Sequence, residues 1–343
     1  MLEISDKESQ LLVAVQRGIQ VVDRPFAVLG EAVGIAEDEV IEFIKNLRAK
    51  GEARRFGAVF DSRKLGYRSA LCAMQVSEDK LPAVSKNITA LRGVTHAYQR
   101  GWSNELPRDS AGGPAENNWP NFWFTLAAPA KSFQDELDAL RAACDPYVIY
   151  ELPALIRFKI DVVFDLRTRE RDERVEPHSS NDLNSTEVFE LDQMQQSIVQ
   201  YLEGDIPVVA DFYGSVADHL GMEKPLLLKT LSGWQSNGVM RRIGLLLRHR
   251  KVGFKANGMC CWNVPKDKIT EAGRRVASAP EVTHCYERPI SNAFPFNLYA
   301  MVHTTSWDKT QALFQQISGD SGLSDGQLLL SVREFKKTSM QFF

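Results

Sequence analysis

Apolar residues near the N-terminus recur every three to four positions, a spacing that predicts three short amphipathic helices. The first two span residues 8–16 and 26–33, and the third ends at Gly51. Gly34 lies just after the second helix, where a glycine commonly caps a helix C-terminus. Three short helices with a glycine between the second and the third are typical of a helix-turn-helix. The residues that follow, ARRFGAVFD, predict a strand or wing.

The same pattern returns 187 residues later, so the chain contains two copies of one unit. Residues 54–67 read RRFGAVFDSRKLGY, and residues 241–254 read RRIGLLLRHRKVGF. Helices are again predicted, at residues 194–202, 212–220 and 225–234. A repeat of this length is too long for a solenoid and indicates a duplicated two-domain protein. His249 of the second copy corresponds to Ser62 of the first, so we expect one working site and one degenerate site.

The second part of each copy alternates apolar and polar residues and is rich in strand-forming residues. In the first copy the predicted elements are strands at 69–76, 94–98, 122–126 and 156–164 and helices at 81–91 and 132–143. In the second copy they are strands at 259–264, 282–286, 298–303 and 328–335 and helices at 266–277 and 307–317. The order βαββαβ is that of a ferredoxin-like unit.

We therefore expect an α+β protein: two tandem copies of a helix-turn-helix domain plus a ferredoxin-like βαββαβ domain. The expected domains are residues 1–53 and 54–166 in the first copy and residues 187–240 and 241–343 in the second. Residues 167–186 are charged, lack an apolar pattern and predict a linker. A Gly-, Pro- and Asn-rich insertion at residues 101–118 lengthens one loop of the first copy.

The composition is that of an ordinary globular protein. The 343 residues are 44% hydrophobic and 25% charged, with a formal net charge of −3 that gives no global attraction to nucleic acid or to an anionic membrane. No apolar run approaches the roughly 20 residues that a membrane span requires, and the N-terminus does not have the pattern of a secretory signal. Five cysteines without metal-binding spacing favour free thiols in a reducing compartment. We expect a cytoplasmic protein with no metal site and no membrane partner.

Basic pairs flank the predicted strand and turn after each helical part. They are Arg54, Arg55, Arg63 and Lys64 in the first copy and Arg241, Arg242, Arg250 and Lys251 in the second. Clustered guanidinium groups bind carboxylates in a bidentate manner, so these pairs suit a polyanionic ligand. Two other interpretations of these basic pairs remain open: a surface that contacts DNA phosphates, and an ordinary solvated surface without a ligand. The acidic residues Glu37, Asp38, Glu39 and Glu42 weigh against DNA, because they lie early in the helix that would read the bases.

His96 and His284 recur at equivalent places in the two copies, within the stretches THAYQR and THCYER. A lone histidine on a strand is more often structural, but recurrence beside the basic pairs favours a function. Histidine can act as a general acid near neutral pH. His249 is a third candidate, and its basic neighbours should lower its pKa. No catalytic triad order, phosphate-binding loop, dinucleotide fingerprint or zinc spacing occurs in the chain.

The predicted architecture resembles the Lrp/AsnC regulators, and the motifs resemble more sharply the siroheme decarboxylases, which are built on that architecture. Those enzymes carry an RR-x-G…HRK-x-G-F…N-G-M…W stretch, which here begins at Arg241 and ends at Trp262. An H-x-Y-x-R-P stretch follows at residues 284–289 and a W/F-P-x-N-L-Y stretch at residues 294–299. The resemblance covers nearly the whole chain and is to the fused form of a two-subunit enzyme.

The first copy departs from these motifs at three places. Ser62 replaces the first histidine, Gln99 stands where the second copy has Glu287, and no proline follows Arg100. These departures favour the second copy as the half that holds the substrate.

The resemblance implies removal of CO₂ from the C12 and C18 acetates of siroheme to give 12,18-didecarboxysiroheme, in heme d1 biosynthesis or alternative heme biosynthesis. It implies His249, His284 and His96 as catalytic residues. The substrate-binding residues that it implies are Arg241, Arg242, Arg250, Lys251, Tyr286, Arg288, Arg54, Arg55, Arg63 and Lys64. No cofactor is required beyond the siroheme iron tetrapyrrole itself, because the macrocycle accepts the electrons. A histidine could instead ligate the iron.

Two other functions remain open. One is an Lrp/AsnC-like DNA-binding transcriptional regulator that senses heme or a small acid, and the other is a heme-binding regulatory protein without turnover. We expect the helix-turn-helix units to form the contact between the two halves and to bind no specific DNA. The sequence leaves open whether the chain forms a homodimer.

Overall fold

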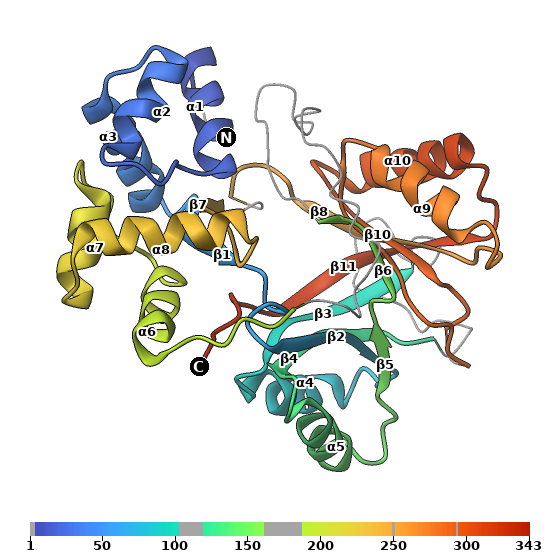
Figure 1. The fold of residues 1–343 in the computed structure, drawn as a ribbon. Coiled ribbons are helices and arrows are strands. Elements are labelled where there is room, and N and C mark those ends of the chain that lie inside the picture. The colour runs from blue at the N-terminus through green and yellow to red at the C-terminus, as the bar shows by residue number, and fades with distance from the viewer. Residues whose placement is uncertain (1–3, 103–118, 161–186, 249–250, 293) are drawn as a thin grey trace.

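The computed structural model describes residues 4–102, 119–160, 187–248, 251–292 and 294–343. A helical part and a sheet part lie side by side, as Figure 1 shows. The predicted α+β class, with helix-turn-helix and ferredoxin-like parts, is confirmed. The predicted linker and all but the first two residues of the predicted insertion lie outside the described residues.

Six helices form the helical part, and each matches a helix predicted from the sequence. They are α1 (Asp6–Arg17), α2 (Pro25–Val33), α3 (Glu37–Ala49), α6 (Gln193–Leu202), α7 (Phe212–Leu220) and α8 (Lys224–Ser236). Gly34 and Gly221 end α2 and α7, with φ angles of 69° and 65° in the left-handed region that favours glycine. The turn between the second and third helices is therefore the same in both helix-turn-helix units.

The two predicted wing strands pair with each other rather than with the large sheet. β1 (Ala53–Phe60) and β7 (Met240–Leu247) form an antiparallel ribbon in which Gly57 lies opposite Gly244. A Cβ at these glycines would lie 2.4 or 2.5 Å from a backbone carbonyl oxygen of the helical part. The absence of a side chain therefore lets backbone from the helical part pack directly on the ribbon.

The ribbon joins the two helical units into one apolar core. Phe26 of α2, Phe56 of β1 and Phe212 of α7 contact one another, with ring centroids 5.6 to 5.9 Å apart. These rings come from both copies, so neither unit has a core of its own. The expectation that the helix-turn-helix units form a contact between the halves is confirmed.

The large sheet has nine strands in the order β5-β2-β4-β3-β11-β8-β10-β9-β6. They are β2 (Tyr67–Met74), β3 (Val94–Trp102), β4 (Phe122–Pro129), β5 (Tyr150–Pro153), β6 (Ile156–Ile160), β8 (Ala256–Trp262), β9 (Val282–Glu287), β10 (Leu298–Thr304) and β11 (Gly326–Lys337). Helices α4 (Leu81–Ala90) and α5 (Phe133–Ala143) pack on the first copy's strands, and α9 (Ile269–Ser278) and α10 (Trp307–Ser321) on the second copy's.

The two copies exchange their last strands. The first half of β11 pairs with β8 of its own copy, and its second half crosses over to pair with β3. The strand predicted for the first copy at residues 156–164 is present as β6, but the sequence predicted neither β5 nor the partner of β6. Residues Tyr150–Pro153 form the strand that pairs with β2, whereas Ile156–Ile160 pairs with β9 of the second copy, and residues 161–164 lie outside the described chain. Alternation reveals a strand but not its partner.

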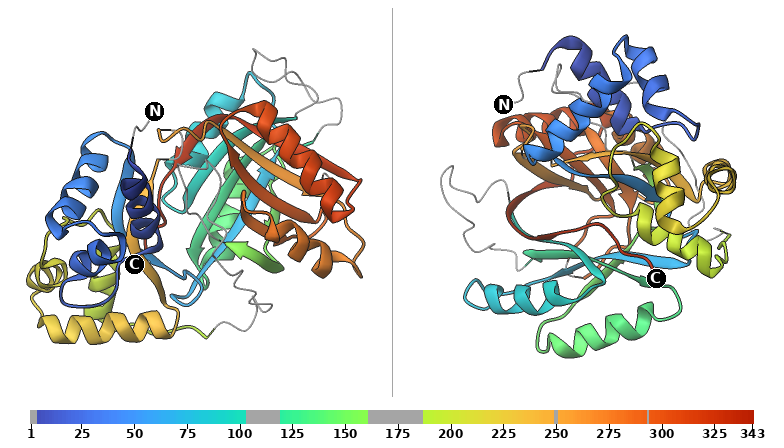
Figure 2. Two further views of the ribbon diagram at one scale, coloured as in Figure 1. Left: turned by 90° about the horizontal axis from the view of Figure 1, so that it is seen from above. Right: turned by 90° about the vertical axis from the view of Figure 1, so that its left-hand side faces the viewer.

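The sheet curves until its two edges approach each other. β5 and β6 are the two ends of the strand order, yet only Ala154 and Leu155 separate them in the chain. Leu155 N–H also donates to the carbonyl oxygen of Glu287 in β9, at 2.9 Å. Figure 2 shows the helical part, in blue and yellow, on one side of the sheet and α9 and α10, in orange to red, on the far side. The inner face of the sheet therefore opens toward the β1–β7 ribbon.

Among the described residues, no helix is long and apolar enough to cross a membrane, and no group of three or more His, Cys, Asp or Glu could hold a metal ion. All five cysteines are buried free thiols.

Candidate active site

A cavity of about 1460 Å³ lies between the inner face of the sheet and the β1–β7 ribbon, and both copies line it. Drug-sized ligands usually occupy about 300–1,000 Å³, so this cavity suits a larger molecule. Twelve basic residues line it: Arg17, Arg54, Arg55, Arg63, Lys64, Arg100, Arg157, Lys159, Arg241, Arg242, Arg288 and Lys337. Only Asp61, Glu187 and Glu203 bring negative charge among the described lining residues. The excess of cations favours a polyanionic ligand.

Each copy presents a histidine and a tyrosine to the cavity from equivalent strands. His96 and Tyr98 lie on β3, and His284 and Tyr286 lie on β9. Residues two apart on a strand share a face, which directs each pair inward. The ring centroids are 6.4 Å apart in the first pair and 6.2 Å in the second. The first copy has therefore kept this part of the site.

A threonine orients each histidine in the same way. His96 Nδ1 lies 3.0 Å from Thr95 Oγ1, and His284 Nδ1 lies 3.0 Å from Thr283 Oγ1. Thr283 donates its hydroxyl proton to the carbonyl oxygen of Met301 at 3.1 Å. The same oxygen can then accept a hydrogen bond from His284 Nδ1–H.

The pKa of His96 is lowered to about 3 in the ligand-free protein. Burial is the main cause, and the positive charges of Lys337 and Arg54 and the neighbouring His284 add to it. His96 is half-buried and lines the cavity. With this pKa the ring is neutral at pH 7.

Arg100 and Arg288 extend the two histidine–tyrosine pairs. The Arg100 guanidinium carbon lies 5.4 Å from the centroid of the Tyr98 ring, and that of Arg288 lies 4.9 Å from the Tyr286 ring. Arg100 Nη1 donates to Ser331 Oγ at 3.0 Å, and Arg288 Nη1 to the Leu152 carbonyl oxygen at 2.5 Å. Burial lowers the pKa of Arg100 to about 10 and also lowers that of Arg288.

These two arginines have no carboxylate partner within the described chain. An uncompensated buried cation is costly, so such groups are typical of a site whose counter-ion is a ligand. Several arginine N–H groups at the cavity are buried without a hydrogen-bond acceptor among the described residues. Among them are Arg54 Nε, Arg63 Nη1, Arg100 Nε and Arg288 Nε.

The arginine pairs of the ribbon also reach the cavity. Arg54 Nη2 donates to Ser339 Oγ at 2.9 Å and Arg55 Nε donates to the same oxygen at 3.2 Å. Burial, together with the charge of Arg54, lowers the pKa of Arg55 to about 10. Arg241 and Arg242 line the cavity from the opposite strand of the ribbon.

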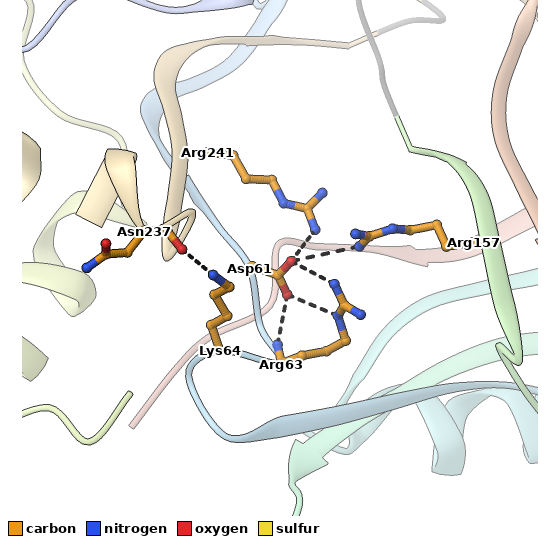
Figure 3. Close-up of polar contacts among 6 residues, drawn as sticks. All are labelled: Asp61, Arg63, Lys64, Arg157, Asn237 and Arg241. Carbon is orange, nitrogen blue, oxygen red and sulfur yellow. Dashed lines mark hydrogen bonds and ion pairs between the residues drawn. The ribbon is translucent and has the colours of Figure 1, made fainter. Parts of the chain in front are cut away.

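A buried carboxylate, Asp61, gathers three guanidinium groups at one part of the wall (Figure 3). Arg63 binds it through Nε at 3.2 Å and Nη2 at 3.0 Å, and Arg241 Nη2 donates to Oδ2 at 2.9 Å. Arg157 Nη1 lies 3.8 Å from Oδ2. Burial raises the pKa of Asp61, but the hydrogen bonds and charges of Arg63 and Arg241 outweigh it and hold the pKa well below its usual range. Lys64 nearby donates to the carbonyl oxygen of Asn237.

Most residues expected from the sequence line this one cavity. They are His96, His284, Tyr286, Arg288, Arg54, Arg55, Arg63, Lys64, Arg241 and Arg242. Lys251 is exposed and is not among the lining residues. His249 and Arg250 lie outside the described residues. Residues of both copies line this one cavity, so the candidate site is shared rather than separate in each copy. Which half works stays a prediction.

Sequence reasoning missed Asp61, Arg157 and Lys337. A signal existed for Asp61, because it stands where the second copy has Arg248, a reversal of charge within an otherwise similar stretch. Arg157 and Lys337 have no such signal, since they reach the cavity only through the exchanged strands β6 and β11.

Comparison with known proteins agrees with this architecture. Residues 64–159 and 251–336 match the AsnC-like ligand binding domain family, and residues 8–54 match the siroheme decarboxylase NirDL-like HTH domain. The siroheme decarboxylase of Hydrogenobacter thermophilus is 35% identical over 341 residues, which cover 97% of this chain and 94% of the relative. The chain belongs to the siroheme decarboxylase family.

Solved structures of the family have the same fold. The crystal structure of the siroheme decarboxylase NirDL superposes with a TM-score of 0.71 and 30% sequence identity, covering 98% of this chain and 94% of that one. A second NirDL structure, in complex with an iron-uroporphyrin III analogue, gives a TM-score of 0.69. Members of the family are carboxy-lyases, and this chain shares the fused, two-copy form of NirDL.

Proposed function

We propose that the chain removes CO₂ from the C12 and C18 acetates of siroheme and releases 12,18-didecarboxysiroheme. The observation that carries this proposal is the single cavity with twelve basic side chains against three acidic ones among the described lining residues. Siroheme carries eight carboxylates, so the charges of ligand and cavity are complementary. The relative bound to an iron-uroporphyrin III analogue supports a tetrapyrrole as the ligand class.

The carboxylates that do not react would fix the orientation of the macrocycle. Arg54, Arg63, Arg100 and Arg288 each have a buried N–H group that no described residue accepts, and carboxylate oxygens would supply the missing acceptors. Binding through several guanidinium groups holds a reacting acetate in one position and removes water from it. The substrate-binding role of Tyr286, and the roles of Arg250 and Lys251, remain proposals on the same grounds.

The chemical step breaks the bond between the acetate methylene carbon and its carboxylate. The electron pair enters the macrocycle, CO₂ leaves, and a proton must reach the methylene carbon to give a methyl group. His96 and His284, which line the cavity from the two copies, would deliver the protons. His249 stays a third candidate, and iron ligation by a histidine stays an alternative role. The macrocycle itself takes up the electrons, so we propose that no further cofactor is required.

Substrate binding would itself make His96 an acid. Lys337 and Arg54 contribute to the low pKa of His96 through their positive charge. Carboxylates placed beside those cations would offset their charge and raise the pKa toward the normal value near 6.5. The histidine would then be protonated only when an anionic substrate is bound.

We further propose that the helix-turn-helix units bind no specific DNA. The first turn of α3 carries Glu37, Asp38 and Glu39, whose charges oppose phosphate contact. Leu227, Leu231 and Trp234 of α8 are buried in the shared core, although Leu226 is exposed. A cytoplasmic location and a homodimer remain proposals.

The test is anaerobic incubation of the purified chain with siroheme, followed by mass spectrometry. Loss of two CO₂ per siroheme without DNA is the expected result. Binding of siroheme with no change in its mass would contradict the proposal and favour a regulatory protein. Sequence-dependent, nanomolar DNA binding at about 150 mM salt would revive the transcriptional regulator.

A further inference from the structure

The three-arginine cluster around Asp61 (Arg63, Arg157 and Arg241) breaks the symmetry of the cavity. Asp61 directly follows β1, Arg63 follows it in the same turn, Arg241 comes from β7, and Arg157 comes from the exchanged strand β6. Residues from both copies thus converge on one carboxylate (Figure 3). The counterpart of Asp61 in the second copy, Arg248, is exposed and does not line the cavity. Among the described residues, the other half of the cavity therefore lacks this arrangement.

The cluster lies beside one of the two histidine–tyrosine pairs. Arg157 lies directly opposite Tyr286 in the pairing of β6 with β9. The charges of Arg157 and Arg241 both lower the pKa of Tyr286, although burial of the ring raises it more. At the corresponding place in the other half, Glu334 lies opposite Tyr98.

Three guanidinium groups this close would repel one another without an anion between them. Burial and the charges of Arg241 and Arg63 lower the pKa of Arg157, whereas Asp61 raises it. One carboxylate against three guanidinium groups leaves two positive charges. Asp61 uses the Nε–Nη2 edge of Arg63 and one donor of Arg241, so further donors remain for a ligand. Arg63 Nη1, for example, is buried without an acceptor among the described residues.

We propose that Asp61 is a positioning residue that holds Arg63, Arg157 and Arg241 as a preformed clamp for substrate carboxylates beside His284. It does not touch the reacting atoms. Because the described residues form such a clamp on one side only, it fixes which way round the unsymmetrical macrocycle lies, and so which acetate meets which histidine. This inference rests on the proposed function.

The decisive variant is Asp61→Asn, which keeps the shape and removes the charge. Single-turnover reactions at saturating siroheme, followed by mass spectrometry, give separate rate constants for the first and the second loss of CO₂. A displacement of about 1 Å in a reacting group costs on the order of 10²-fold in rate. We therefore expect Asp61→Asn to slow one of the two steps by roughly ten- to a hundredfold more than the other.

Asp205→Asn is the matched control. Asp205 also binds an arginine, Arg48, at 2.6 Å and accepts from a backbone N–H, but it does not line the cavity. This variant should leave both rate constants unchanged. Asp61→Asn could instead lower both rate constants equally and lower the thermal midpoint more than Asp205→Asn does. That result would mean that Asp61 only supports the fold, and it would overturn the proposal. Rate constants within twofold of the parent would also overturn it.

A double-mutant cycle checks the mechanism. If Asp61 acts by holding Arg241, then Asp61→Asn should cost much less in an Arg241→Gln background than in the parent. An equal cost in both backgrounds would show that Asp61 acts independently of Arg241. Failure of the proposed function would appear differently, because the parent itself would then release no CO₂.

Discussion

The two halves of the cavity carry the same side chains in different electrostatic surroundings. His96, Tyr98 and Arg100 repeat the geometry of their counterparts in the second copy, down to the threonine contact of 3.0 Å at each histidine. The neighbouring strands differ. Lys337 lies opposite His96, whereas Ile160 lies opposite His284.

A duplicated fold can therefore keep equivalent histidines in both copies while the neighbouring strands give them different electrostatic surroundings. Exchanged strands supply Lys337 to one half of the cavity and Ile160 and Arg157 to the other. A substrate with two reacting acetates could use both halves of one cavity. The second copy thus forms one part of the wall of a shared cavity.

Removing either of the two histidines that recur in both copies should have the largest effect. His284→Ala and His96→Ala should each lower turnover by roughly 10²-fold or more if both histidines deliver protons. His219→Ala is the control, because this exposed residue stacks on Tyr201 in the helical part, outside the cavity. Product analysis would show whether each variant stalls after one CO₂. If His96→Ala keeps full activity in both steps, the two halves are not functionally equivalent.

Removing a buried cation should weaken substrate binding. Arg100→Met and Arg288→Met each delete a charged hydrogen-bond donor, so siroheme affinity, measured by absorbance titration, should fall roughly ten- to a hundredfold. The thermal midpoint should stay the same or rise, because an uncompensated buried charge destabilises the ligand-free fold. A large fall in thermal midpoint with unchanged affinity would show that these arginines serve the fold instead.

Substituting the residue opposite His96 should give a smaller effect, which is visible in the pH dependence of the free energy of unfolding. His96 has a folded-state pKa of about 3, whereas the unfolded value is near 6.5. Between those values the unfolded state binds a proton that the folded state does not, so this histidine makes stability fall as the pH drops from 6.5 toward 3.

Lys337→Ile removes one of the charges that lower the pKa of His96 and copies the residue found opposite His284. Urea unfolding at pH 7 and pH 5 should show a smaller loss of stability in this variant than in the parent. His96→Gln should show the same reduced loss, and the two changes together should add little. An unchanged pH dependence in both single variants would contradict the pKa assigned to His96.

The sequence by itself determined the elements and the duplication. Spacing of apolar residues and capping glycines predicted all six helices of the helical part, because those signals are local along the chain. The paired stretches around His96 and His284 identified both histidines and Arg288, since repetition in sequence implied repetition in structure. Arg100, the counterpart of Arg288, was not among the expected site residues although it lines the cavity. The charge reversal at Asp61 was also visible, although its meaning was not.

Only the tertiary structure decided how the two copies share one site. A strand pattern specifies which side chains share a face but not which strand lies alongside, so the exchange of β6 and β11 could not be predicted. The pairing of β1 with β7 likewise depends on packing between distant parts of the chain. For this reason Arg157 and Lys337, distant in sequence from either histidine, became lining residues of the cavity.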